Sequence, residues 1–187
     1  MGLPSVRCRQ ANEGKPMRLP TNIKPEDVTA IVDSREQRPL SLAPLRVQTA
    51  GLCTGDYSLL GCEHIVRIER KSLDDLLGCV GVHRERFDRE LQRLLAFPCR
   101  VLLVEATWDQ IEAGGWRSKV TADAAIGSIL GCQAAGLSIH CVGDHDRAGR
   151  HAARLLFTVA RRRYRELRAL VPQDRTGCTT ASEDGRR

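Results

Sequence analysis

Aromatic side chains are scarce in this sequence of 187 residues, at 4% of the total. A core must therefore be filled mainly by Leu, Val, Ile and Ala, within a hydrophobic fraction of 42%. No apolar run approaches the roughly 20 residues that a membrane-spanning helix needs. No apolar stretch follows Arg7 and Arg9, so a secretory signal is not expected. This composition favours a globular domain and excludes a membrane-embedded one.

Paired cysteines are also lacking. None of the eight cysteines forms a Cys-x-x-Cys pair, the spacing typical of a structural zinc site. Several lie in apolar stretches such as 97–104 and 139–142, where a free thiol acts as a small hydrophobic group. We therefore expect a reducing, intracellular setting, either the cytoplasm or nucleoid of a prokaryote or phage or the nucleus of a eukaryote.

Lysine is rare, with four lysines against 25 arginines, although the net charge is +6 and the sequence pI about 9.1. A basic balance favours an anionic partner, and nucleic acid is the commonest one. Lysine can lose its charge on burial whereas arginine stays charged. A lysine that stands among acidic residues is therefore a candidate for catalysis.

The order of apolar patterns predicts one domain, residues 27–170, between a flexible N-terminal arm (1–26) and a flexible C-terminal tail (171–187). Strands are expected at 28–32, 45–50, 57–60, 64–70, 100–105 and 137–142. Helices are expected at 72–77, with Ser72 as N-cap, and at 84–97, 121–135 and 146–170. This alternation indicates an α/β sandwich, a central mixed sheet flanked by helices.

Two carboxylates and a lysine meet on the expected hairpin of 57–60 and 64–70. Because side chains alternate along a strand, Glu69 and Lys71 share one face and Arg70 points to the other. Asp56 begins the preceding strand and can approach Glu69. Two carboxylates suit a hard divalent ion such as Mg²⁺, which polarises a phosphodiester and lowers the pKa of a bound water. Glu-x-Lys by itself is common and indicates no more than a solvated strand edge.

A longer pattern surrounds these residues. Gly55-Asp56, then twelve residues, then Glu69-Arg70-Lys71-Ser72-Leu73-Asp74-Asp75 resembles the Gly-Asp…Glu-Arg-Lys-x-x-x-Asp motif of the xeroderma-pigmentosum group F (XPF) nuclease family, which has the restriction-endonuclease-like fold. The spacer is slightly longer than is usual there. Upstream, residues 32–36 resemble the family's Val-Asp-x-Arg-Glu motif, and 84–94 and 101–105 resemble its following helix and strand. The resemblance covers about residues 28–170.

The resemblance implies roles for the matching residues. Asp56 and Glu69 would bind Mg²⁺ or Mn²⁺, with Asp33 as a further acidic ligand or a contact to a metal-bound water. Lys71 would be the catalytic base or would stabilise the phosphate.

Two further residues of the motif receive supporting roles. Asp75 would order Arg70, Lys71 or a metal-bound water. Arg70, on the reverse face of the strand, would support the site structurally.

Arginines are the candidates for contacts to DNA phosphates. In a projection of the 146–170 helix at about 100° per residue, an arginine stripe lies opposite the apolar face. We interpret the stripe as a surface that follows phosphates, with plain solvation as the alternative. For Arg35 the alternative to a phosphate contact is an ion pair with Asp33 or Glu36. For Arg84 and Arg86 it is a solvated position at the start of the 84–97 helix. The candidates are Arg35, Arg84, Arg86, Arg147, Arg150, Arg154, Arg161 and Arg165.

Weaker patterns have simpler interpretations. Asp144-His145-Asp146 could hold a metal, but Asp146 is more simply the N-cap of the last helix. Trp108 and Trp116 could stack on a base, although packing beneath a helix is the simpler expectation.

The sequence therefore predicts a Mg²⁺- or Mn²⁺-dependent DNA endonuclease. The resemblance implies a branched or flapped substrate, a role in DNA repair or recombination, and a homodimer or heterodimer, here through the apolar parts of helices 121–135 and 146–170. One alternative is a catalytically silent module of the same fold that binds DNA or docks a partner, and a more distant one is a nuclease subunit acting on RNA. The complete acidic set and its lysine favour the enzyme.

Overall fold

Six strands form one mixed sheet in the computed structural model, which describes residues 19–171. Across the sheet the order is β2-β1-β3-β4-β5-β6. β1 is parallel to β2 and antiparallel to β3, β3 is antiparallel to β4, and β4, β5 and β6 are parallel. The strands are β1 (Thr29–Asp33), β2 (Arg46–Ala50), β3 (Tyr57–Leu59), β4 (Val66–Ser72), β5 (Cys99–Glu105) and β6 (Ser138–Cys141). The expected mixed sheet and its β3–β4 hairpin are confirmed.

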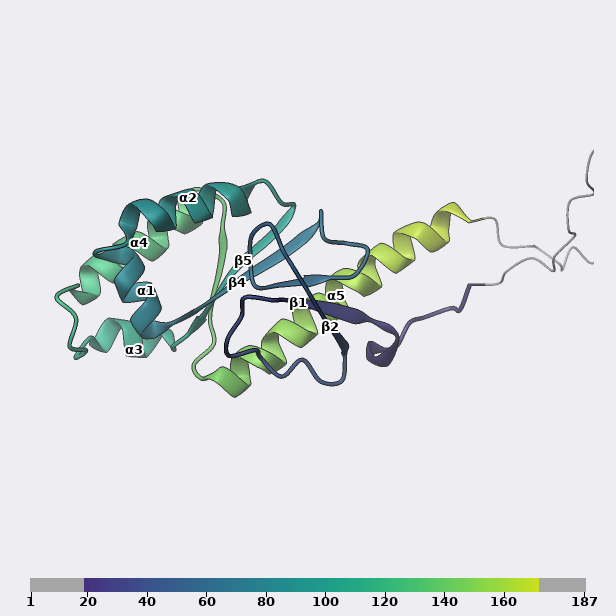
Figure 1. Cartoon of the computed structure of the whole chain (residues 1–187), viewed down its shortest axis with the longest axis horizontal. Coiled ribbons are helices and arrows are strands. Elements are labelled where there is room, and N and C mark those ends of the chain that lie inside the picture. The colour runs from purple at the N-terminus through teal and green to yellow at the C-terminus, as the bar shows by residue number, and fades with distance from the viewer. Residues whose placement is uncertain (1–18, 172–187) are drawn as a thin grey trace, which may run out of the picture.

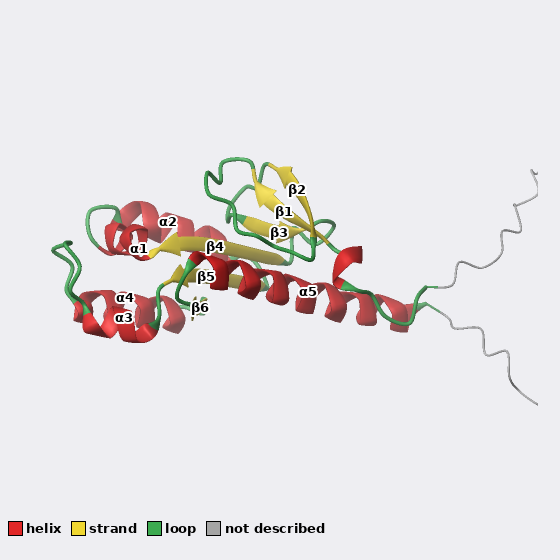
Figure 2. Ribbon diagram, turned by 90° about the horizontal axis from the view of Figure 1, so that it is seen from below, coloured by secondary structure: helices red, strands yellow, loops and turns green. Residues whose placement is uncertain are grey.

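Helices cover both faces of this sheet (Figures 1 and 2). They are η1 (Pro25–Asp27), α1 (Leu73–Val80), α2 (Arg84–Leu95), α3 (Trp108–Ala113), α4 (Ala122–Ala134) and α5 (His145–Leu170). The long α5 runs along one face, and α1 to α4 gather beyond the other. The sequence did not predict η1 or α3, because elements of three and six residues are too short to show a helical period. None of the helices between residues 19 and 171 is long and apolar enough to cross a bilayer.

Alternation along the central strands divides the core in two. Val66 and Ile68 of β4 pack with Val101 and Leu103 of β5 against α5. Leu102 and Val104 of β5 face the other way. They belong to a second core beneath α1, α2 and α4. The odd-numbered residues of β4 therefore lie on the side of α1 and α2.

Part of the expected N-terminal arm packs against α5. The Tyr164 hydroxyl donates to the Pro20 carbonyl, and Arg168 donates to the Thr21 carbonyl at 3.1 Å. Ile23 packs against the core below α5. Residues 20–26 therefore belong to the packed part of the chain, because their apolar and polar groups find partners on a long helix. Residues 1–18 of the expected arm and 172–187 of the expected tail lie outside the described residues.

The structure corrects the predicted N-cap of α5. The predicted cap, Asp146, lies in the first turn, and Asp144 is the N-cap, with its side chain accepting from the Arg147 amide at 2.7 Å. Extended backbone at Asp144 (φ −106°, ψ 173°) places its carboxylate for this bond. The expectation for the tryptophans agrees with the structure, since Trp108 and Trp116 both pack against the core beneath α4.

Gly149 lets α5 approach the loop after β1 closely. A Cβ at this position would stand 2.6 Å from the Ser41 carbonyl oxygen, which is backbone and cannot swing away. On α4, a Cβ at Gly127 would meet nothing within 4 Å.

We therefore predict that Gly149→Ala lowers the free energy of unfolding by about 1–3 kcal/mol through overpacking. The matched control Gly127→Ala is expected to raise it by about 0.5–1 kcal/mol, because alanine favours a helix interior. Urea denaturation measures both. A Gly149→Ala protein as stable as the wild type would contradict this account of the α5 contact.

Two histidines join β6 to α5. Nδ1 of His140 lies 2.7 Å from Nε2 of His151, and the rings meet edge to face. Burial lowers the pKa of both rings; the neighbouring His151 lowers that of His140 further, and Arg154 that of His151. Since folding lowers these pKa values, the unfolded chain binds more protons at and below about pH 6.5, and stability falls as the pH drops through that window.

The histidine pair should accordingly lower the unfolding free energy between pH 7.5 and pH 5.5, whereas the raised pKa values of Asp56 and Glu69 act in the opposite direction over this window. On acidification, His151→Gln should therefore shift toward higher stability relative to the wild type, while the exposed control His64→Gln should match the wild type. Chemical denaturation at the two pH values gives the comparison. Equal changes in wild type and His151→Gln would show that this pair does not contribute to the pH dependence.

Candidate active site

Backbone pairing brings the end of β1, the start of β3 and the middle of β4 to one place. The Asp33 amide donates to the Asp56 carbonyl and the Asp56 amide to the Ile68 carbonyl, both at 2.8 Å. Gly55, the residue before Asp56, has φ +75°. A Cβ at this position would meet the Ile68 carbonyl oxygen at 3.2 Å. A glycine is therefore required for the chain to turn against β4 and place Asp56 beside Glu69.

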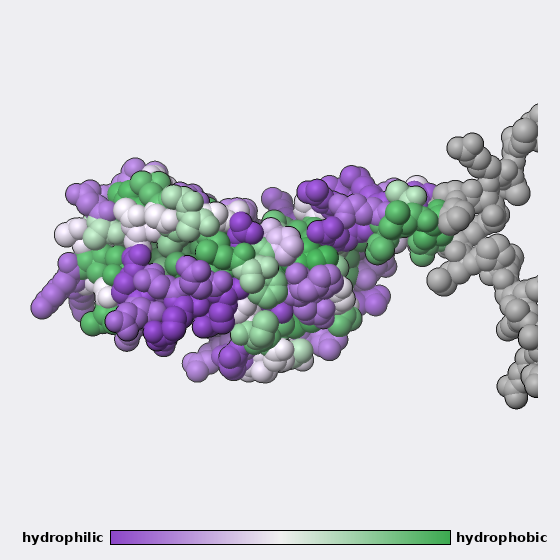
Figure 3. Space-filling model, turned by 90° about the horizontal axis from the view of Figure 1, so that it is seen from above, coloured by the Kyte–Doolittle hydropathy of each residue, from purple (hydrophilic) through white to green (hydrophobic). Residues whose placement is uncertain are grey.

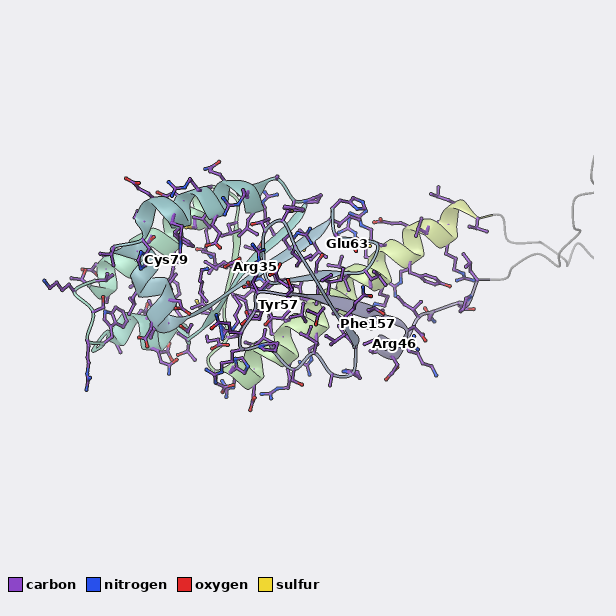
Figure 4. The ribbon with its side chains drawn as sticks, in the orientation of Figure 1. Arg35, Arg46, Tyr57, Glu63, Cys79 and Phe157 are labelled. Atoms are coloured by element: carbon purple, nitrogen blue, oxygen red, sulfur yellow. The ribbon has the colours of Figure 1, made fainter. Side chains whose placement is uncertain are left out.

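A cleft of about 740 Å³ opens at this point. Its floor is the uncovered part of the sheet, and its sides are the loops after β1 and β2 and the helices α1 and α2. In Figure 4, Arg35 lies over the middle of the sheet, and Cys79 on α1 marks the opposite side; both line the cleft.

Two carboxylates and a lysine form the centre of the cleft. Glu69 is buried, at 3% exposure, and Asp56 is partly buried. One oxygen of Asp56 accepts from the Arg70 amide at 2.7 Å, and one oxygen of Glu69 accepts from Lys71 Nζ. The ammonium of Lys71 also lies 3.1 Å from Glu90 on α2. The structure thus brings Asp56, Glu69 and Lys71 together, as the sequence predicted.

Burial makes ionisation of the two carboxylates difficult. It raises the pKa of Asp56, and it raises that of Glu69 further, where the negative charge of Asp56 adds to the effect. Two like charges close together in a poorly solvated place favour either a proton or a cation between them. Lys71 offsets only part of the charge.

Lys71 is held in its charged form. Burial acts to lower its pKa, but Glu69 and Glu90 together raise it above the ordinary value for lysine. The protonated form suits stabilisation of a phosphate; the other expected role, as a base, would require loss of this proton, and both roles stay predictions.

Both carboxylate oxygens of Asp33 accept hydrogen bonds from the protein itself. Its two oxygens accept from the Arg35 guanidinium at 2.8 and 3.0 Å, and from the backbone amides of Arg35 and Leu52 at 2.8 and 2.7 Å. The Arg35 side chain and these amides lower the pKa of Asp33 to about 2, against the effect of burial. These contacts disfavour direct ligation of a metal by Asp33, while the other expected role, a contact to a metal-bound water, stays a prediction. Of the two ion pairs considered for Arg35, the one with Asp33 is formed.

Arg70 lies on the reverse face of β4, as expected. Its Nε is 3.0 Å from Glu105 at the end of β5, and the same carboxylate oxygen lies 2.6 Å from Nδ1 of His145 at the start of α5. This buried cluster ties β4, β5 and α5 together behind the cleft, which is a supporting role.

Asp75 is differently placed from the expectation. It is exposed on α1, and its carboxylate accepts from the Ser72 hydroxyl at 2.7 Å, while Ser72 caps the Asp75 amide at 3.1 Å. The carboxylate thus completes the helix cap at the rim of the cleft and makes no hydrogen bond to Arg70 or Lys71 within residues 19–171. Its third expected partner, a metal-bound water, stays a prediction.

Two solved structures of XPF from Aeropyrum pernix are similar to this chain. The first superposes with a TM-score of 0.57 at 19% sequence identity, over 76% of this chain and 69% of that one. The second, XPF in complex with DNA, has a TM-score of 0.52 at 18% identity, over 75% of this chain and 66% of that one. The chain has an XPF-like nuclease fold. No protein-family model and no curated protein matches the sequence.

In this XPF-like fold the predicted arginines separate into three groups. Arg35 and Arg86 line the cleft. Arg84 stands outside it, where Nη1 donates to the Ser128 hydroxyl at 2.7 Å and Nε contacts Asp88. Figure 3 shows hydrophilic side chains gathered over α2. The third group, on α5, is exposed but belongs to the opposite face of the sheet and does not line the cleft: Arg147, Arg150, Arg154, Arg161 and Arg165.

Among the residues of the cleft that sequence reasoning missed are three charged side chains. Arg93 and Glu90 line it from α2 together with Arg86, and Arg38 lines it from the loop after β1. Positions 86, 90 and 93 follow the i, i+4, i+7 spacing of one helix face, so helical periodicity could have found the α2 residues once Arg86 was chosen. The loop position of Arg38 carries no such signal.

The cluster behind β4 yields a stability prediction. Glu105→Gln is expected to lower the free energy of unfolding by about 3 kcal/mol, because removal of one charge from a buried ion pair leaves Arg70 uncompensated. The same substitution at the exposed Glu26 should change it by less than about 0.5 kcal/mol. Guanidinium denaturation gives both values, and equal effects at the two positions would rule out a supporting role for the cluster.

Proposed function

We propose that this chain is a Mg²⁺- or Mn²⁺-dependent endonuclease that cleaves DNA. The observation that carries the proposal is the Asp56–Glu69 pair, whose burial and mutual repulsion call for a cation, beside the charged Lys71 in an open cleft. The XPF-like fold, and the likeness to a structure of XPF in complex with DNA, support DNA as the substrate.

The donor set fits a hard divalent ion. Asp56 and Glu69 each have one oxygen engaged, by the Arg70 amide and by Lys71, and therefore each has a second oxygen to offer. Within residues 19–171 no group of three or more His, Cys, Asp or Glu side chains is placed to hold an ion. Two carboxylates with water in the other positions is an arrangement that Mg²⁺ commonly adopts in nucleotide-processing enzymes.

A bound ion would supply electrophilic polarisation of the scissile phosphate and a water of lowered pKa. The chain's own residues would do the rest. Lys71, kept charged between Glu69 and Glu90, places a positive charge where negative charge grows on the phosphate oxygens. Asp33 and Arg35 fix the loop that bears Leu52 at the side of the cleft. Arg86 and Arg93 would bind neighbouring phosphates without reading the base sequence.

Further parts of the proposal come from the resemblance and the composition. The substrate would be branched or flapped DNA in repair or recombination, inside the cell. The chain would pair with a second copy or a related protein through the apolar parts of α4 and α5, where Leu130, Leu167 and Leu170 are exposed. The α5 arginines would contact DNA outside the cleft.

A catalytically silent module remains the second candidate. The pairing of Lys71 with two carboxylates is consistent with a structural ion pair that binds no metal. The two candidates differ in metal-dependent cleavage.

A nicking assay separates them. Labelled duplex, splayed-arm, 3′-flap and 5′-flap DNAs are incubated with the protein in Mg²⁺, in Mn²⁺ and in EDTA. We expect metal-dependent cleavage that falls at least about 100-fold in Glu69→Gln and in Lys71→Ala, since each removes a charge at the reacting phosphate. The charge-matched controls Glu26→Gln and Lys24→Ala, both exposed, should cut as the wild type does. Binding of branched DNA without cleavage by any of the proteins would favour the silent module.

A further inference from the structure

Arg67 is a buried cation without an anionic partner among the described residues. It lies on β4 two residues before Glu69, on the same face, and is 4% exposed. Its Nε and Nη1 have no hydrogen-bond partner within residues 19–171. Nη2 has only the weak acceptor Cys53 Sγ, at 3.8 Å.

The surroundings compensate this charge only in part. The guanidinium carbon lies 4.8 Å from the centre of the Phe97 ring, so one face of the group gains a cation–π contact. That contact does not satisfy the N–H groups at the edge of the guanidinium. The hydroxyl of Thr54, 6% exposed, likewise has no partner within the described chain. Arginine cannot lose its proton, and buried donors without acceptors are unfavourable.

Arg67 does not itself line the cleft, but residues in contact with it do. Cys53 and Thr54 line the cleft, and the stem of Arg67 packs beneath Gly55. Residues two apart on a strand are separated by about 6.6 Å. Arg67 is therefore one step along β4 from the carboxylate of Glu69.

We propose that Arg67 and Thr54 form a phosphate-binding subsite for the nucleotide next to the cleavage position, an inference that rests on the proposed function. A phosphate presents planar pairs of oxygens to the guanidinium fork and an acceptor to the hydroxyl. It thereby satisfies all three unused donors and supplies the missing counter-charge. The subsite fixes which phosphate of the strand lies over Asp56 and Glu69.

Access to Arg67 depends on a short segment. Leu52 is anchored by Asp33 and Arg35, and the Asp56 amide is anchored to β4. Residues 53–55 between these anchors have no regular secondary structure. An outward shift of this segment opens the guanidinium to the cleft without breaking any strand pairing.

The test uses inorganic phosphate and DNA as separate probes, both in EDTA, so that neither readout needs a metal or cleavage. In phosphate, against chloride at equal ionic strength, the wild-type Tm should rise by several degrees, and Arg67→Met should lose that rise. Without phosphate, Arg67→Met should be at least as stable as the wild type, since an unpaired buried charge has been replaced by an apolar chain of similar length. Its affinity for an oligonucleotide should fall about tenfold.

Arg46→Met is the matched control. It removes the same charge from an exposed position on β2, far from Arg35 and the cleft in Figure 4, and should keep both the phosphate effect and the DNA affinity. If Arg67→Met does not fold, Thr54→Val, which removes only the hydroxyl, should still reduce the Tm rise.

Three results would overturn the subsite. One is a phosphate-dependent Tm rise that survives Arg67→Met or, where that variant does not fold, Thr54→Val. Another is a loss of stability in Arg67→Met with unchanged DNA affinity, which assigns Arg67 a packing role. The third is a lost phosphate effect with unchanged DNA affinity, which means that the site takes free phosphate and not the substrate backbone. A protein that behaves as expected here but cuts no DNA would overturn the nuclease proposal alone.

Discussion

Two carboxylates held side by side where water is scarce are the constraint on which this site depends. Asp56 and Glu69 reach that position through backbone bonds, since the Asp56 amide donates to β4 and the Arg70 amide donates back to the Asp56 side chain. The arrangement leaves negative charge that Lys71 neutralises only in part. This cluster by itself contributes little to the stability of the fold, because burial of like charges is unfavourable. The charge and burial of the two carboxylates therefore suit the binding of a cation.

The rest of the structure holds that place in position from both sides. Behind β4, Arg70, Glu105 and His145 join two strands to the start of α5. In front, Asp33 and Arg35 hold the Leu52 loop. Around both lie the two cores, divided by the alternation of side chains along β4 and β5. The same alternation puts the metal-binding candidates on one face of the sheet and the α5 arginine stripe on the other, so a single straight duplex cannot meet both.

Much of this architecture could be predicted from the sequence, because long elements carry a period. The mixed sheet, the Ser72 cap and the juxtaposition of Asp56, Glu69 and Lys71 followed from alternation and from one hairpin. Short elements such as α3 could not be found in this way. The partners of Asp33 could not be predicted either, since the Leu52 amide comes from a loop 19 residues away in the sequence. The lack of a partner for Arg67 is a property of packing and has no signature in the sequence.

The most direct test of the central claim is the position of a bound ion. Crystals soaked in Mn²⁺ and measured at a wavelength where manganese scatters anomalously would locate it without reference to activity. The account predicts one peak bound by a carboxylate oxygen of Asp56 and one of Glu69, and its disappearance in Glu69→Gln. No peak between these two side chains, or one that persists in Glu69→Gln, would contradict the assignment of this cleft as a metal-dependent active site.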